Sequence, residues 1–139
     1  MAEPRVLIID DNAANVELAI FVLEDAGYVV SAVTDAAEAL AQVASYQPNL
    51  ILMDIQLSVG DGLQLTRVLK SDPATSDIAI VAFTAYAMKG DEARLRAAGC
   101  DAYIAKPIDV ARFARQVEAA LGAGLPMDLD TLWSELADR

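Results

Sequence analysis

The stretch RVLIIDDN, residues 5–12, begins with a short run of β-branched and aliphatic residues that stops at two adjacent acids. A continuous apolar run of this kind is typical of a strand buried on both faces, as in a parallel sheet. The run NLILM at residues 49–53 repeats the pattern and is followed by another acid, Asp54. The sequence therefore predicts buried parallel strands whose ends carry carboxylates.

The rest of the chain alternates between short apolar runs and segments with helical spacing. Further strands are predicted at residues 28–33, 78–83 and 101–105, and helices at residues 12–26, 35–46, 63–71, 88–98 and 109–121. Gly27 and Pro48 stand where the first two helices should end, and Asp35 is placed to cap the second. Five rounds of strand and helix predict an α/β fold, with helices covering both faces of a parallel sheet.

Composition excludes several classes of protein. The chain has 139 residues, the length of one ordinary domain, and 55% of them are hydrophobic, which argues against disorder. Ten Lys and Arg residues stand against 21 Asp and Glu residues, and the net charge of −11 argues against direct binding of nucleic acid. Histidine is absent, which excludes a Ser-His-Asp triad and His-ligated zinc.

The single cysteine, Cys100, indicates the cellular compartment. It cannot form an intramolecular disulfide, which is typical of a protein in a reducing environment. The longest apolar runs are far shorter than a membrane span, and the N-terminus does not resemble a signal peptide. We therefore expect a cytoplasmic protein without membrane contact.

The domain organisation is expected to be simple. We predict one domain over residues 1–124 and a tail over residues 125–139, which is too short to form an output domain. In the tail, Asp130 is placed to cap a short amphipathic helix that carries Leu132, Trp133 and Leu136.

Charged and hydroxyl side chains stand at the predicted strand ends. They are Asp10 and Asp11, Thr34, Asp54, Thr84 and Lys106. In a parallel sheet these ends lie on one edge, so the acids would meet there and repel one another. A divalent cation would relieve that repulsion, and Mg²⁺ is preferred because it takes carboxylate and phosphate oxygens.

The same set of residues suits phosphoryl transfer. An Asp carboxylate can act as the nucleophile and form an aspartyl phosphate. Lysine can pair with a phosphate oxygen and a threonine hydroxyl can donate to another, while the metal neutralises developing charge.

Five segments in this order resemble the receiver domain of two-component response regulators. They are VLIIDDN (6–12), LILMDIQL (50–57), DGL (61–63), AFTAYAMKGD (82–91) and GCDAYIAKPI (99–108). The resemblance covers about residues 4–122 and is strongest to single-domain receivers of the cell-cycle and chemotaxis kind. It implies a flavodoxin-like (βα)5 fold, a three-layer sandwich around a five-stranded parallel sheet of order 2-1-3-4-5.

The resemblance implies the metal and acceptor residues. Asp54 would be the phosphoacceptor. Asp11 and Asp54 would ligate Mg²⁺ directly together with the main-chain carbonyl of Gln56, and Asp10 would act through a metal-bound water. The family usually has proline at the position of Ser58 and a bulky apolar residue at that of Gly60, so the loop after the acceptor is expected to be looser than usual.

The resemblance also implies a switch. Thr84 would donate to the phosphoryl group, Lys106 would pair with it, and Tyr103 would turn inward as Thr84 moves. The peptide bond between Lys106 and Pro107 would be cis. Gln56 and Tyr86 would tune the lifetime of the phosphoryl group.

These inferences predict a response regulator that is not an enzyme beyond its own phosphorylation and dephosphorylation. A histidine kinase or a histidine phosphotransfer protein would phosphorylate Asp54. The signal would leave through the surface of the fourth helix, fifth strand and fifth helix, toward a target protein or a second copy of the chain. A homodimer could form through that surface or through the tail.

Three alternatives remain at this stage. A receiver-fold interaction module without phosphorylation is disfavoured by the complete set of site residues. A small Mg²⁺-dependent phosphatase with an aspartyl-phosphate intermediate would need an acid where Gln56 stands. A flavin-binding protein of the same topology would need a Ser/Thr/Gly-rich loop after the first strand, which is missing.

Overall fold

A computed structural model of the protein describes residues 4–55, 62–84, 89–106 and 108–122. The elements are β1 (Arg5–Ile9), α1 (Ala13–Asp25), β2 (Val29–Val33), α2 (Ala36–Tyr46), β3 (Leu50–Met53), α3 (Gly62–Ser71), β4 (Ala79–Thr84), α4 (Lys89–Ala98), β5 (Ala102–Ala105) and α5 (Val110–Gly122). The strands and helices predicted within residues 5–121 are found, with boundaries shifted by at most one residue. None of the helices in these ranges is long and apolar enough to cross a membrane.

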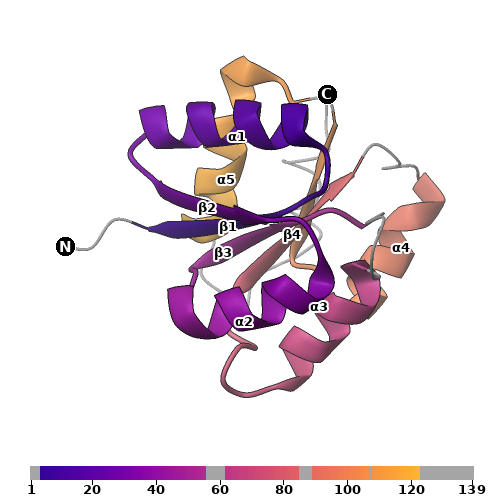
Figure 1. Ribbon diagram of the computed structural model, residues 1–139. Helices are drawn as coiled ribbons and strands as arrows, with labels where there is room; N and C mark the ends of the chain where they lie inside the picture. Colours follow the sequence, from indigo (N-terminus) through magenta and orange to yellow (C-terminus); the bar gives the residue numbers. More distant parts are fainter. Residues whose placement is uncertain (1–3, 56–61, 85–88, 107, 123–139) are drawn as a thin grey trace.

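The five strands form one parallel sheet of order β2-β1-β3-β4-β5. Figure 1 shows α1 and α5 on one side of this sheet and α2 and α3 on the other. This is the predicted three-layer, flavodoxin-like arrangement. In this order the first and third strands are neighbours, which decides where the acids meet.

Alternate residues of each central strand supply two separate cores, because successive side chains point to opposite faces of a sheet. Val6 and Ile8 pack toward α1 and α5, whereas Leu7 and Ile9 pack toward α2, α3 and α4. All four side chains are fully buried. The unbroken apolar runs of the sequence reflect this two-sided burial.

Local signals in the sequence set the helix ends. The side chains of Asn12 and Asp35 accept hydrogen bonds from the main-chain N–H groups of Asn15 (3.0 Å) and Glu38 (2.8 Å), which caps α1 and α2. Gly27 follows α1 with φ +101°, a conformation that favours glycine.

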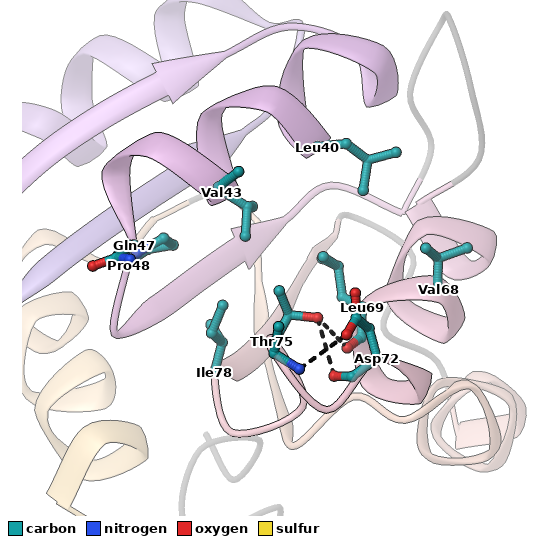
Figure 2. Close-up of a pocket in the computed structure, with 11 residues that line it drawn as sticks. Leu40, Val43, Gln47, Pro48, Val68, Leu69, Asp72, Thr75 and Ile78 are labelled. Atoms are coloured by element: carbon teal, nitrogen blue, oxygen red, sulfur yellow. Dashed lines mark hydrogen bonds between the residues drawn. The ribbon is translucent and has the colours of Figure 1, made fainter.

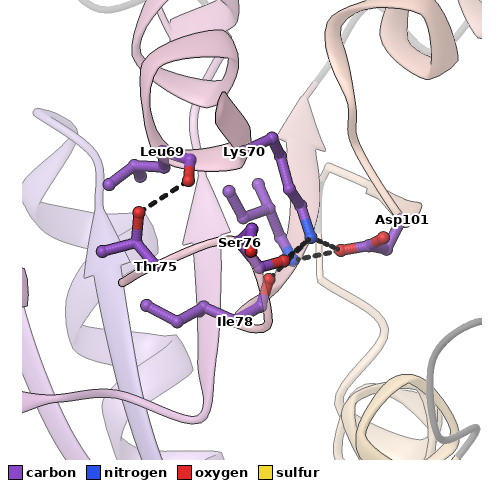
Figure 3. A network of polar contacts seen from close by, with 7 residues as sticks. Leu69, Lys70, Thr75, Ser76, Ile78 and Asp101 are labelled. Atoms are coloured by element: carbon purple, nitrogen blue, oxygen red, sulfur yellow. Dashed lines mark hydrogen bonds and ion pairs between the residues drawn. The ribbon is translucent and has the colours of Figure 1, made fainter. Parts of the chain in front are cut away.

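A polar network ties elements together at the edge where the strands begin (Figure 3). The Lys70 ammonium at the end of α3 lies 2.7 Å from Asp101 Oδ2 and donates to the carbonyls of Ser76 (3.2 Å) and Ile78 (2.8 Å). Asp101 Oδ2 also accepts from the main-chain N–H of Ile80 at 2.8 Å. Asp101 is thus held before β5, which starts at Ala102 and not at the predicted residue 101.

Candidate functional site

The acids that follow β1 and β3 lie side by side. Ile9 pairs with Met53 in the sheet register, so the next residues, Asp10 and Asp54, leave the sheet together. The main-chain N–H of Asp54 donates to the carbonyl of Ile9 at 2.9 Å and fixes this register at the strand end. One carboxylate oxygen from each of Asp10, Asp11 and Asp54 lies within 4.8 Å of the other two. The predicted meeting of the three acids is therefore observed.

Burial makes this cluster costly. Asp10 is fully buried and Asp54 is 6% exposed, while Asp11 is open to solvent. A carboxylate taken out of water needs a compensating charge or hydrogen bonds. Lys106 supplies one: its Nζ lies 2.9 Å from Asp10 Oδ2 and 3.4 Å from Asp54 Oδ2. One ammonium can balance only one of three carboxylates, so the cluster has capacity for a further cation.

The donor chemistry fits Mg²⁺. Asp10 Oδ1 accepts from the main-chain N–H of Asn12 at 2.9 Å, which orients the carboxylate. Its buried Oδ2 makes no hydrogen bond among the described residues, although Lys106 pairs with it electrostatically. Carboxylate oxygens at this spacing, one of them exposed, are the ligands that Mg²⁺ takes while keeping several waters.

Lys106 is positioned by both its backbone and its side chain. Its main-chain N–H donates to the carbonyl of Thr84 at 2.9 Å, at the end of the β4–β5 ladder. Its Nζ lies 5.0 Å from the ring centroid of Phe83, within the range of a cation–π interaction. Phe83 is fully buried and packs on Phe113, with ring centroids 5.9 Å apart. The Lys106 ammonium thus lies over the buried ring of Phe83 while it faces the acids.

Thr84 and Tyr103 lie where the sequence predicted. Thr84 is the last residue of β4 and is 4% exposed, so its hydroxyl stands at the same edge of the sheet as the acids. Tyr103 lies in β5, pairs with Ala82 in register, and packs partly buried against the core on the α2–α4 side. Their proposed roles as a switch pair stay predictions.

Gly62 is a site residue whose role sequence reasoning missed. A Cβ atom at this position would run into the main-chain carbonyl of Asp54 and lie 2.9 Å from the Cα of Ile55. The first residue of α3 therefore approaches the main chain after β3 more closely than a side chain would allow. The DGL segment at residues 61–63 carries the signal for this glycine, but the segment alone does not show which part of the chain it approaches.

Several predicted features lie outside the described residues. These are the carbonyl of Gln56, the departures at Ser58 and Gly60, the tuning position Tyr86, the peptide bond to Pro107, and the tail from residue 125 to residue 139. They remain predictions.

Comparison with known proteins identifies the family. The profile described as "Response regulator receiver domain" matches residues 6–118. The polar-differentiation response regulator DivK of Brucella anthropi is 44% identical over 117 residues, which cover 84% of this chain and 95% of that protein. DivK of Brucella ovis matches with the same identity and coverage.

Solved structures agree with the fold. A putative response regulator from Chloroflexus aurantiacus superposes with a TM-score of 0.82 at 28% identity, covering 87% of this chain and 99% of that one. The receiver domain of the sensor histidine kinase PA1611 from Pseudomonas aeruginosa, described with a magnesium ion in its active site cleft, gives a TM-score of 0.78 at 31% identity, covering 87% and 99%. Since the profile spans most of the chain and the DivK relatives share 44% of the aligned residues, this protein belongs to the response regulator receiver domain family.

Proposed function

We propose that this protein is a DivK-like response regulator that accepts a phosphoryl group on Asp54 in a Mg²⁺-dependent reaction. The observation that carries the proposal is the cluster of three carboxylates within 4.8 Å of one another, with the Lys106 ammonium between Asp10 and Asp54. Receiver domains exchange phosphoryl groups with histidine kinases or histidine phosphotransfer proteins, and we propose that one of these is the donor.

In the proposed step, a carboxylate oxygen of Asp54 attacks the phosphorus of a phosphohistidine on the donor. The new P–O bond forms as the donor's P–N bond breaks, and the phosphohistidine, already protonated on its other ring nitrogen, leaves as neutral imidazole with the P–N electron pair. An Asp carboxylate is a nucleophile of the kind that forms aspartyl phosphates. Lys106 then faces a phosphate oxygen, and the Thr84 hydroxyl donates to another.

Asp11 and Asp54 would hold the metal directly, and Asp10 would do so through a water. When bound, Mg²⁺ would supply positive charge against the oxygens of the transferred group. Without the metal, the three negatively charged carboxylates would repel an incoming phosphoryl group, which is why the reaction would need Mg²⁺. Lys106 would move its contact from Asp10 toward the phosphoryl oxygen.

The output proposed is a change at the surface of α4, β5 and α5, through Thr84 and Tyr103, which is read by a target protein or by a second copy of the chain. The protein would act catalytically only on its own phosphorylation and hydrolysis. We also propose a cytoplasmic location, which the buried, unpaired Cys100 and a kinase partner support.

Intact-mass measurement after incubation with Mg²⁺ and acetyl phosphate tests the proposal. We expect the mass of one added phosphoryl group, which hydroxylamine removes and which Asp54→Asn abolishes. The matched control is Asp25→Asn, an exposed acid at the end of α1, which should be phosphorylated like the parent. No adduct with any donor would indicate an interaction module, and rapid turnover of phosphate monoesters would indicate a phosphatase.

A further inference from the structure

An apolar groove lies between α2 and α3, away from the acidic cluster (Figure 2). Its volume is about 470 Å³, and its apolar lining includes Leu40, Val43, Pro48, Val68, Leu69 and Ile78. Val43 and Leu69 are buried and form the floor. Leu40 and Val68, on facing helices, are 46% and 41% exposed and form the rims. Two large apolar side chains left half open on either side of a groove indicate a site for an apolar occupant.

Thr75 and Asp72, two of the polar residues that line the groove, make hydrogen bonds within the chain. Thr75 Oγ1 donates to the carbonyl of Leu69 at 2.6 Å, and the main-chain N–H of Thr75 donates to the carbonyl of Asp72 at 2.9 Å. Asp72 Oδ1 accepts from the main-chain N–H of Ala74 at 2.9 Å. These contacts form the turn after α3 seen in Figure 2. A small polar ligand would find these groups engaged, so the groove suits aliphatic and aromatic side chains.

The chain itself carries a segment of matching chemistry. The family profile ends at residue 118 and α5 ends at Gly122, which leaves residues 123–139. Within them Leu132, Trp133 and Leu136 fall on one face of a helix that Asp130 would cap. A helix this short is unstable alone in water and needs an apolar surface against which to pack.

Geometry allows the segment to reach the groove. In this fold the helices run opposite to the strands, so α5 ends at the edge where strands begin, the edge at which Pro48 and Ile78 line the groove. The segment must cross from one helix layer to the other, roughly 20 Å, or twice the usual spacing of packed layers. Residues 123–129 span up to about 25 Å when extended. The linker is therefore long enough.

Charge favours the groove over the other apolar surface. Residues 128–138 carry four acids, Asp128, Asp130, Glu135 and Asp138. One acid, Asp72, lines the groove, and Arg5 lies at its side, where its Nε donates to the carbonyls of Tyr46 (2.9 Å) and of the lining residue Gln47 (3.0 Å).

The rival surface is on α1, where Phe21 is 69% exposed and Leu18 is 37% exposed. Glu17, Glu24 and Asp25 surround these residues and would repel an acidic segment. The groove between α2 and α3 has one acid in its lining, fewer than this surface, and it offers a hollow that apolar side chains can fill.

We propose that residues 130–136 fold as a short amphipathic helix and dock in the α2–α3 groove of the same chain. A second copy could offer the same segment, but a seven-residue linker gives the attached segment an effective concentration in the millimolar range. Docking covers Leu40 and Val68 and leaves α1, α4 and α5 free for partners. The proposal is independent of the phosphorylation of Asp54.

Trp133 is the single tryptophan of the chain and reports on docking directly. We expect its emission in the full-length protein to be blue-shifted, and its quenching by acrylamide to be several-fold weaker, than in a synthetic peptide of residues 125–139. Leu40→Glu should abolish most of this protection because it places a carboxylate on the groove rim. Val68→Ser, which adds no charge, should reduce the protection in the same direction.

Leu18→Glu on α1 is the matched control, because it makes the same change at a leucine of similar exposure. It should leave the emission and quenching of Trp133 unchanged, and circular dichroism should show all variants folded. The proposal is overturned if Trp133 in the full-length protein is as accessible as in the peptide. It is also overturned if Leu18→Glu exposes Trp133 while Leu40→Glu does not, or if the protection disappears on dilution, which would indicate a second copy.

Discussion

The Lys106 ammonium lies closer to Asp10, at 2.9 Å, than to Asp54, at 3.4 Å. Asp10 is fully buried and Asp54 is slightly exposed. The lysine therefore lies nearer to the carboxylate that is less accessible to solvent. The lysine thus stabilises the folded protein before it meets any phosphoryl group. This structural role and the proposed pairing of Lys106 with a phosphoryl group can be separated experimentally.

Lys106→Met should destabilise the protein by about 3 kcal/mol when Mg²⁺ is absent, because it leaves buried carboxylates without their cation. Saturating Mg²⁺ should recover part of this loss by replacing the missing positive charge. Urea unfolding with and without Mg²⁺ measures both effects.

Lys70→Met is the matched control, since it breaks a 2.7 Å ion pair with Asp101 at the opposite edge of the sheet. It should also destabilise, but Mg²⁺ should not recover more stability than it adds to the parent protein. Equal recovery in both variants would show that Lys106 does not share the metal-binding cluster.

Asp11→Asn should weaken Mg²⁺ binding by roughly tenfold or more, since substitution of even outer-shell groups at metal sites has effects of this size. Asp11 is exposed, so stability without metal should stay the same or rise slightly as repulsion within the cluster falls. Isothermal titration calorimetry measures the affinity, with Asp25→Asn as a control that should bind Mg²⁺ like the parent. Unchanged affinity in Asp11→Asn would remove this residue from the metal site.

Gly62→Ala should destabilise the protein by about 1–3 kcal/mol, because the added methyl must displace the main chain of Asp54 and Ile55. At an ordinary helical position the same change is stabilising by about 0.5–1 kcal/mol. A decrease in the free energy of unfolding would therefore indicate the close backbone contact at Gly62. The rate of phosphorylation by acetyl phosphate should fall as well, since the carboxylate moves with its backbone.

Gly27→Ala is a control that separates a general loss of stability from a specific loss of phosphorylation rate. Gly27 has φ +101°, and a methyl group added there would meet nothing within 4 Å, so alanine strains the backbone without touching the site. It should lower stability and leave phosphorylation unchanged. A Gly62→Ala protein that reacts at the parental rate would contradict a positioning role.

Cys100 should be inert in the folded protein. Burial raises the pKa of its thiol to about 12, against a smaller lowering effect from its hydrogen bond with Thr66. Because the thiolate is the reactive form, Ellman's reagent should react slowly at neutral pH and rapidly after unfolding in urea. Fast reaction of the native protein would mean that the thiol is accessible.

The raised pKa of Cys100 also predicts a pH dependence. The folded state holds the thiol proton more tightly than the unfolded state, so this stability is fully present below pH 9.0 and is lost as the pH rises toward 12. The free energy of unfolding should therefore fall less steeply in Cys100→Ala than in the parent over that range. If the free energy of unfolding fell equally steeply with pH in both proteins, the raised pKa of Cys100 would be contradicted.

The sheet and the meeting of its acids were predictable from the sequence. The runs before Asp10 and Asp54 have no polar alternation, which requires burial on both faces, and the carboxyl ends of parallel strands share one edge. The strand order came from the resemblance and not from periodicity, because nothing in the apolar pattern says which strands are neighbours.

Contacts between distant residues were not predictable. Lys106 was expected to meet the phosphoryl group, but its preference for Asp10 depends on the relative depth of two carboxylates. The 5.0 Å approach of its ammonium to Phe83 depends on how β4 and β5 pair. Asp101 was predicted as part of the last strand, whereas its carboxylate holds it before that strand. The partners of this carboxylate, Lys70 and Ile80, are 31 and 21 residues away in sequence, so no local pattern indicates the contacts.

The main-chain hydrogen bond from Lys106 to the carbonyl of Thr84 joins the two proposed phosphate-facing side chains through their backbones. If Thr84 moved toward a phosphoryl group, this bond would carry its displacement to the backbone of Lys106 through the main chain. The strand ends of β4 and β5 would then respond together.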